Sequence, residues 1–257
     1  MRILGNCPFI RSQKCSDSTK RWGDMVFCNV CGSSNLRDFN GRPSAICASC
    51  GAVERTRILK TILDATGWIQ PGQRVMHLAP EYGIGLFIKN IVGKGYEAFD
   101  ISPERYPPEL NTRLLDLVTG AEKLPSQHYD IVLHSHVMEH LPCNETAVLY
   151  HLHRSLKPGG KHIFCIPIHD GHYESDLGNL SGEERTRRFH QHDHIRRFGL
   201  ADFQNTIGMI FDLKLFDLER LVGATQLRSN AIPEEGWRGV SGHMYYFAEK
   251  DDIKLKE

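Results

Sequence analysis

Four apolar residues between positions 53 and 66 recur at helical spacing: Ile58, Leu59, Ile62 and Leu63. The opposite face of the same stretch carries charge, at Glu54, Arg55, Arg57 and Lys60. Spacing by three and four residues predicts an amphipathic helix that buries its apolar stripe. Gly67 and the pair Pro71–Gly72 end this helix and mark a domain boundary, because neither residue type continues a helix well.

Beyond residue 72, short apolar runs alternate with stretches of helical pattern. Strands are expected over 74–79, 96–101, 113–117, 129–136 and 161–168, with helices over 83–91 and 145–156. Strands that are repeatedly separated by helices of this length predict a parallel sheet with helices on both faces. The fold class expected from the pattern is therefore α/β.

A polar stretch over residues 169–198, rich in histidine and arginine, interrupts this alternation and is too long for a routine connection. A helix over 200–207 follows, and the runs 209–217 and 243–250 predict a hairpin-like pair of strands at the sheet edge. We therefore expect one domain over 70–257 with a polar insertion at about 169–198. Residues 1–24 show no period and are expected to form an irregular N-terminal segment.

Two Cys-x-x-Cys pairs, separated by 15 residues, precede the predicted helix: Cys28, Cys31, Cys47 and Cys50. Each pair forms a knuckle that directs two thiolates to one point, and two knuckles complete the closed tetrahedron typical of structural zinc. We expect these cysteines to bind Zn²⁺ in a zinc-ribbon module with a linker helix over 25–69. Four buried cysteines or a redox pair are the alternatives, and Cys7 and Cys15 have no such spacing.

Charge and composition narrow the class of protein. Lys plus Arg and Asp plus Glu both number 31, so no overall positive field attracts nucleic acid. No apolar run approaches the ~20 residues of a membrane span, and residues 1–15 lack the apolar core of a signal peptide. We therefore expect a cytoplasmic protein with no membrane partner, in which the eight cysteines are reduced or metal-bound.

Polar residues follow the predicted strands at their carboxyl ends, where open α/β sheets bind ligands. The second strand ends at Asp100–Ile101, the third at Asp116–Leu117 and the fourth at His134–Ser135–His136. An acid after the second strand can accept both hydroxyls of a ribose, and an acid after the third can accept an exocyclic adenine amine. For each acid alone, a helix N-cap or a loop role is the alternative.

The stretch from Asp130 to Pro142 reads DIVLHSHVMEHLP, and LKPGG follows it at 156–160. These motifs resemble the fourth- and fifth-strand signatures of class I S-adenosylmethionine-dependent methyltransferases, over about residues 70–217. The Leu-Ala-Pro-Glu turn at 78–81 beside a zinc knuckle pair is similar to one subgroup of that family. The resemblance implies a Rossmann-like, seven-stranded methyltransferase sheet, with S-adenosylmethionine as the cofactor. It implies cofactor contacts at Ala79, Glu81, Gly83, Asp100, Ile101, Asp116, Leu117 and Ser135.

The first loop departs from the family pattern of an acid followed by three glycines at alternate positions. His77 stands at the acid position, and Ala79, Glu81 and Gly83 stand at the glycine positions. Glycine there lets the backbone pass close to the methionine part of the cofactor. Glu81 therefore either contacts the amino group of the cofactor or indicates a loop with a different path.

The insertion contains candidate catalytic residues in the run RFHQHDHIRRFG at 188–199. Asp193 and His194 are a candidate acid–base pair in which the carboxylate orients the imidazole, and His136 and His140 are further candidates for deprotonating a hydroxyl. Arg196 and Arg197 are candidates for holding an anionic group. A structural role in a polar loop is the alternative for each. A metal site of His190, His192 and His194 is disfavoured, because alternate positions on a helix do not converge.

The leading hypothesis is O-methylation of a small polar acceptor that is sugar-like or anionic, such as a glycan precursor. It depends on the subgroup resemblance and the polar insertion. One alternative is an RNA methyltransferase in which Arg55, Arg57 and Lys60 contact phosphates, although zero net charge argues against a nucleic acid partner. The other alternative is a non-catalytic methyltransferase-like adaptor that binds protein through the zinc module. The sequence indicates no oligomeric state.

Overall fold

A computed structural model describes residues 26–255 of the chain. Its main sheet has seven strands in the order β11-β12-β7-β6-β3-β4-β5. The strands are β3 (Val75–Leu78), β4 (Tyr96–Asp100), β5 (Arg113–Leu114), β6 (Tyr129–Ser135), β7 (Leu156–Cys165), β11 (Lys214–Leu215) and β12 (Tyr246–Glu249). The strands β3 to β7 run parallel to one another, and β12 runs antiparallel to β7 and β11. The predicted α/β class with a Rossmann-like, seven-stranded sheet is confirmed.

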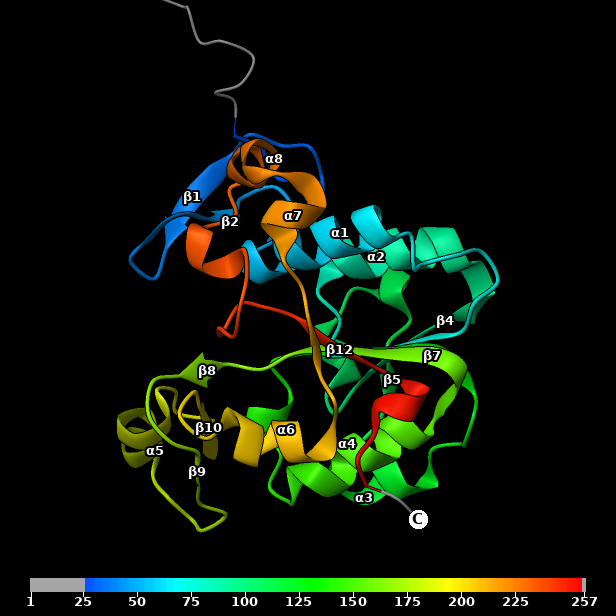
Figure 1. The fold of residues 1–257 in the computed structure, drawn as a ribbon, viewed down its shortest axis with the longest axis vertical. Coiled ribbons are helices and arrows are strands. Elements are labelled where there is room, and N and C mark those ends of the chain that lie inside the picture. Colours follow the sequence, from blue (N-terminus) through cyan, green and yellow to red (C-terminus); the bar gives the residue numbers. More distant parts are fainter. Residues whose placement is uncertain (1–25, 256–257) are drawn as a thin grey trace, which may run out of the picture.

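Helices cover both faces of this sheet (Figure 1). One face carries α1 (Glu54–Thr66), α2 (Tyr82–Val92) and α7 (Leu218–Val222), and the other carries α3 (Leu117–Gly120), α4 (Glu145–Arg154) and α6 (Ile207–Ile210). Successive side chains of a strand point to opposite faces, so Val75 belongs to the first core and Met76 to the second. None of the helices within residues 26–255 combines the length and apolar composition needed to cross a bilayer.

Two smaller units flank the main sheet. The cysteine-rich segment contains an antiparallel pair, β1 (Leu36–Phe39) and β2 (Arg42–Cys47). The polar insertion forms a sheet of three short strands in the order β8-β10-β9, together with the helix α5 (Gly182–Phe189). The strands are β8 (Ile168–His169), β9 (Glu174–Ser175) and β10 (Arg196–Gly199). Cys7, Cys15 and the expected irregular segment over 1–24 lie outside the described residues.

The end of the chain differs from the sequence-based expectation. The strand expected over 209–217 contains the end of α6 and only a two-residue strand, β11, which does pair antiparallel with β12. The pair is not a hairpin, because α7 and α8 (Ala224–Ser229) lie between its strands. Leu218, Leu227 and Ile232 from this stretch are buried against α1, but their spacing follows no single helical period. The apolar pattern alone therefore indicated no element there.

The predicted charged face of α1 is partly buried. Arg57 has no exposed surface and Glu54 only 4%, although both were expected on the solvent side. The guanidinium of Arg57 donates to four backbone carbonyls, those of Ser44, Ala45, Ala52 and Ala231. The cysteine-rich segment and the stretch after α8 cover this face, so it lies between two packed units instead of facing water.

Three histidines inside the sheet make the stability of the protein depend on pH. His77, His134 and His162 are at most 2% exposed. The Nδ1 atom of His77 lies 3.0 Å from the Tyr96 hydroxyl, and the Nε2 atoms of His134 and His162 are 3.0 Å apart. Burial lowers the pKa of His77 and of His134 to about 3, and it lowers the pKa of His162 well below its ordinary value.

Stability is expected to fall below about pH 6.5. The unfolded chain binds protons on these histidines near their ordinary pKa of about 6.5, whereas the folded chain keeps them neutral. As the pH falls from about 6.5 to about 5.5, each histidine therefore lowers the free energy of unfolding by about 1 kcal/mol. Urea unfolding at a series of pH values checks this, and His77→Gln should reduce the slope. The exposed His192→Gln should leave it unchanged. A free energy independent of pH below 6.5 would contradict the expectation.

Candidate active site

The loop after β3 lies at the carboxyl edge of the sheet and turns sharply into α2. Ala79 has a φ of 47°, in the left-handed region, and its N–H donates to the carbonyl of Phe99 at 2.9 Å. Glu81 occupies the N-cap position of α2, and its carboxylate lies 3.0 Å from Nε of Arg55 on α1. The charge of Glu81 is therefore matched by Arg55, and this pair connects the loop to the first helix.

Gly83 has a packing reason for its missing side chain. A Cβ atom there would lie 2.7 Å from Cγ1 of Val30, in the first cysteine knuckle. The knuckle therefore rests directly on the first turn of α2. Gly83 was expected to allow close approach of a cofactor, and in the structure it accommodates Val30.

The two acids at the carboxyl edge are held differently. Asp100 ends β4 and accepts hydrogen bonds from the Tyr106 hydroxyl at 2.7 Å and the Ser102 N–H at 2.8 Å. Asp116 caps α3, accepting from the N–H of Val118 at 2.8 Å and from the hydroxyl of Thr119. The capping alternative is thus realised for Asp116.

Apolar and hydroxyl groups complete this edge. Ile101, directly after Asp100, is 64% exposed, and Val118 beside Asp116 is 41% exposed, whereas Leu117 is buried in the core. At the end of β6, the side chain of Ser135 lies beside the fully buried phenol of Tyr245, whose pKa burial raises well above its ordinary value. Tyr245 lies in the run 243–250, which predicted only an edge strand, because such a pattern does not distinguish a site residue from the core.

A group that we call the histidine–carboxylate cluster follows β6 directly and consists of His136, Glu139, His140, Asp193 and His194. In it, Oε1 of the fully buried Glu139 lies 3.3 Å from Nδ1 of His136 and 4.0 Å from Nε2 of His140. Nδ1 of His140 lies 3.5 Å from the Asp193 carboxylate, and the rings of His140 and His194 are 4.7 Å apart. The structure therefore brings together all four sequence-predicted catalytic residues, around a carboxylate that was not among them.

The pairing inside the cluster differs from the expected one. Asp193 contacts His140, whereas Nδ1 of His194 lies 3.0 Å from the carbonyl oxygen of Phe189. The chain turns between these neighbours, so their side chains face different partners. Asp193 thus orients His140, and the backbone orients His194.

The polar insertion is fixed to the cluster by hydrogen bonds. The N–H of Ile195 donates to the carbonyl of Glu139 at 3.0 Å. Arg196, only 1% exposed, donates to the carbonyls of Met138 and Cys143 and lies 3.3 Å from Glu145. The expectation that Arg196 holds an anionic ligand is therefore wrong, because its donors are already used inside the protein. Arg197 lies 3.6 Å from Glu174.

The charges within the cluster favour an ion pair between protonated His136 and ionised Glu139. Burial opposes the charged form of His136, but Cys165 and the carboxylate of Glu139 raise its pKa to about 10. Burial also opposes the ionised form of Glu139, but His136 and His140 outweigh it and hold the pKa of this carboxyl below its ordinary value. The surroundings of His136 therefore favour its charged form, paired with Glu139, and its Nε2 lies 3.2 Å from the carbonyl oxygen of Gly242. A role for His136 as the base stays a prediction.

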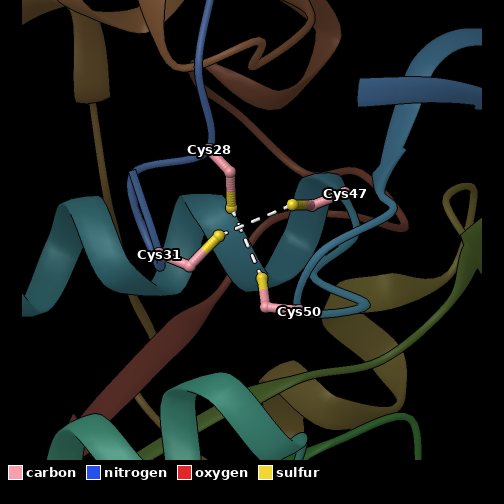
Figure 2. A group of neighbouring side chains, drawn as sticks. All are labelled: Cys28, Cys31, Cys47 and Cys50. Atoms are coloured by element: carbon pink, nitrogen blue, oxygen red, sulfur yellow. Dashed lines mark hydrogen bonds between the residues drawn. The ribbon is translucent and has the colours of Figure 1, made fainter. Parts of the chain in front are cut away.

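The four cysteines of the two knuckles converge on one point beside α1 (Figure 2). Sγ of Cys28 lies 3.7 Å from Sγ of Cys50, and Sγ of Cys31 lies 3.6 Å from Sγ of Cys47. All four sulfur atoms lie within 4.8 Å of one another, and each cysteine is free of disulfide bonds. A tetrahedron of sulfur atoms 2.3 Å from a central ion has edges of about 3.8 Å. The separations match that geometry.

The three cations of α1 that the RNA-binding alternative requires have partners within the protein. Arg57 is enclosed by backbone carbonyls, Arg55 is paired with Glu81, and Nζ of Lys60 contacts Asp64 at 2.7 Å and the ring of Phe87. Arg57 is therefore not available to a phosphate, contrary to the RNA-binding alternative.

Comparison with known proteins identifies the family. A family model described as a methyltransferase domain matches residues 54–207, more than half of the chain. Among solved structures, the chain is similar to an S-adenosylmethionine-dependent methyltransferase from Mesorhizobium loti, with 12% identity, coverage of 72% of this chain and 94% of that chain, and a TM-score of 0.44. It is also similar to one from Archaeoglobus fulgidus, with 16% identity, coverage of 76% and 94%, and a TM-score of 0.44. No curated protein matches the chain. The chain therefore belongs to the methyltransferase domain family and is an S-adenosylmethionine-dependent methyltransferase.

Proposed function

We propose that this methyltransferase methylates a hydroxyl oxygen of a small, polar, sugar-like acceptor. The observation that carries the proposal is the histidine–carboxylate cluster, which lies directly beyond β6 and is joined to the polar insertion. The proton of a hydroxyl acceptor has to leave during methyl transfer, so a site for it needs groups that exchange protons. A cluster of three imidazoles and two carboxylates supplies such groups.

The residues at the carboxyl edge fit S-adenosylmethionine. Asp100 would accept the ribose hydroxyls, and the exposed Ile101 and Val118 offer an apolar surface to the adenine ring. Asp116 and Leu117 would border the adenine, and Ser135 the sulfonium side. Ala79, Glu81 and Gly83 would lie nearest to the methionine part, where the Arg55–Glu81 pair would offer both charges to its amino and carboxylate groups.

Methyl transfer mainly requires that the hydroxyl oxygen be aligned with the methyl group of the cofactor. In the reaction a carbon–oxygen bond forms as the sulfur–carbon bond breaks, the sulfur keeps the electron pair, and the hydroxyl proton leaves. Proximity supplies much of the rate enhancement in such a displacement. His140 is half-exposed and lies 3.5 Å from Asp193, so in this proposal it would face the acceptor.

We further propose that Cys28, Cys31, Cys47 and Cys50 bind a structural Zn²⁺ ion. The sulfur separations of 3.6 and 3.7 Å support tetrahedral coordination, and four thiolates leave no open position for a substrate. The knuckles beside a Leu-Ala-Pro-Glu loop support membership of the subgroup that combines both features. A thiolate site of this kind is stable in a reducing compartment, which supports a cytoplasmic protein.

Transfer of a labelled methyl group tests the acceptor. We expect purified protein to move the label from S-adenosylmethionine to a hydroxyl of a free sugar or sugar nucleotide, identified by mass spectrometry of the product. Asp100→Asn should weaken S-adenosylmethionine binding about 10- to 100-fold in calorimetry, because a charged acceptor for the ribose hydroxyls is lost. The exposed Asp251→Asn is the matched control.

Two results would contradict the proposal. Label that appears only on an amine or on RNA would exclude O-methylation of a sugar. Unchanged S-adenosylmethionine affinity in Asp100→Asn would remove Asp100 from the cofactor site. Cofactor binding without turnover on any acceptor, together with a stable co-purifying protein, would favour the adaptor alternative.

A further inference from the structure

We propose that Glu139, His140 and His194 bind a divalent transition-metal ion, separate from the four-cysteine site. Each of the three residues offers one ligand atom, and these atoms lie within 4.8 Å of one another. Two imidazoles and one carboxylate are a ligand set that suits zinc, iron, manganese or cobalt and leaves coordination positions open. Metal binding here does not depend on the proposed acceptor, whereas its role in methyl transfer rests on the proposed function.

The second ring nitrogen of each imidazole faces an oxygen atom of the protein, as it commonly does in metal-binding histidines. A histidine that binds a metal usually gives its other ring nitrogen to a carboxylate or a backbone carbonyl, which fixes the ring. Nδ1 of His140 lies 3.5 Å from the Asp193 carboxylate, and Nδ1 of His194 lies 3.0 Å from the carbonyl oxygen of Phe189. The Nε2 atoms of both rings are therefore available to an ion. Asp193 holds the ring of His140, and the carbonyl of Phe189 holds the ring of His194.

The carboxylate of Glu139 is fully buried but lacks, within residues 26–255, the hydrogen bonds that a buried carboxylate normally accepts. The side chain has no exposed surface, yet neither of its oxygens accepts a hydrogen bond of good geometry from any described residue. Its charged neighbours are Nδ1 of His136 at 3.3 Å and Nε2 of His140 at 4.0 Å. A buried carboxylate is costly unless it is paired and hydrogen-bonded, so a cation bound to its free lone pairs would complete the site.

The geometry needs only a small adjustment to accept an ion. Metal–nitrogen distances of about 2.1 Å place tetrahedral ligands about 3.4 Å apart, so the ligand atoms have to approach by about 1 Å. His140 can make this movement, because its side chain is 36% exposed while Glu139 and His194 are buried. The same exposure leaves the open side of the ion facing solvent.

An ion bound by these three residues would have open coordination positions for a further ligand. Its open positions take oxygen donors, and a hydroxyl of the sugar-like acceptor is such a donor. Coordination to a divalent ion lowers the pKa of a hydroxyl or a water molecule, which favours loss of the proton. His140 then acts as a ligand, and Asp193 sets its orientation from the second coordination sphere.

Metal content of the full chain, produced without a polyhistidine tag, tests the proposal. The protein is equilibrated with excess Zn²⁺, desalted and analysed by mass spectrometry of the metal. We expect the unaltered protein to hold one ion per chain more than His140→Ala, His194→Ala and Glu139→Gln. His192→Ala is the matched control, because His192 lies in the same loop, is exposed, and should keep the full content. The difference between variants is independent of how much zinc the cysteines hold.

A second measurement uses the unaltered protein and so does not depend on the folding of variants. One equivalent of Zn²⁺ is added first to fill the thiolate site, and Co²⁺ is then titrated. We expect a weak visible absorption band from nitrogen and oxygen ligands, without sulfur-to-cobalt charge transfer. No cobalt band, or equal metal content in the unaltered protein and all three variants, would overturn the proposal. Lost S-adenosylmethionine binding at full metal content would count against the proposed function alone.

Discussion

Cys28→Ser is expected to lower the melting temperature by roughly 10 °C and to release the zinc ion, because three thiolates hold the ion much less tightly than four. Binding of structural zinc contributes about 10 to 16 kcal/mol in small zinc modules, so losing even about 4 kcal/mol of it gives a shift of this size. Differential scanning calorimetry and metal analysis measure both effects. Chelation of the unaltered protein should act in the same direction.

The effect should extend beyond the cysteine-rich segment. Val30 in the first knuckle occupies the space beside Gly83 on α2, and Nδ2 of Asn29 donates to the carbonyl of Arg57 and to the Thr61 hydroxyl on α1. Loss of the ion would therefore loosen contacts at the loop that leads from β3 into α2. We expect S-adenosylmethionine affinity to fall together with stability.

Cys143→Ser is the matched control for this experiment. Cys143 is a half-buried thiol outside the knuckles, and only its backbone carbonyl is used as a hydrogen-bond acceptor. This variant should keep its zinc content, with little change in melting temperature. Zinc-free purified protein with the melting temperature of the loaded form would contradict the structural role of the ion.

Arg57→Met is expected to destabilise the protein by about 4 kcal/mol, or roughly 10 °C in melting temperature. The methionine keeps the bulk of the side chain but leaves four carbonyl oxygens without their charged donor. One of these carbonyls belongs to Ala231, so the loss also affects the contact between the cysteine-rich segment and the stretch after α8. Urea denaturation measures the free energy change.

Arg37→Met separates this effect from a simple loss of charge. Arg37 lies on β1 in the same segment, is exposed, and has neither a side-chain hydrogen bond nor an ion pair with any described residue. Its replacement should change the free energy of unfolding by less than about 0.5 kcal/mol. An equal loss in both variants would show that Arg57 acts only through its charge.

Local sequence patterns predicted the helices and strands well, because these elements depend mainly on residues that are close together in the chain. The short apolar runs of the strands and the helical spacing of Ile58, Leu59, Ile62 and Leu63 are both local features of the chain. Strand-end residues such as Asp100 and Ser135 fall at the carboxyl edge, since parallel strands share that edge. The domain boundary expected near residue 70 stays a prediction. In the structure, α1 packs into the core beside the sheet.

The pairing of charged groups was beyond a local pattern. From the sequence, Glu81 was an acid at a glycine position of the cofactor loop, and Arg57 was expected to face solvent. Arg55 stands opposite Glu81, and Ala231 stands 174 residues from Arg57. Such partners come from segments that are distant in the chain, and no periodicity encodes them.

The sequence by itself determined the α/β class, the succession of the main strands along the chain and the four thiolates with the spacing of a zinc site. Those features depend on residue type and on short spacings, which folding carries over unchanged. Only the tertiary structure decided which side chains meet. It turned Asp193 toward His140, fixed Arg196 on the backbone after β6, and assembled the ligand set around Glu139. The physical reason is that the insertion packs back onto the end of β6, about 50 residues earlier in the chain.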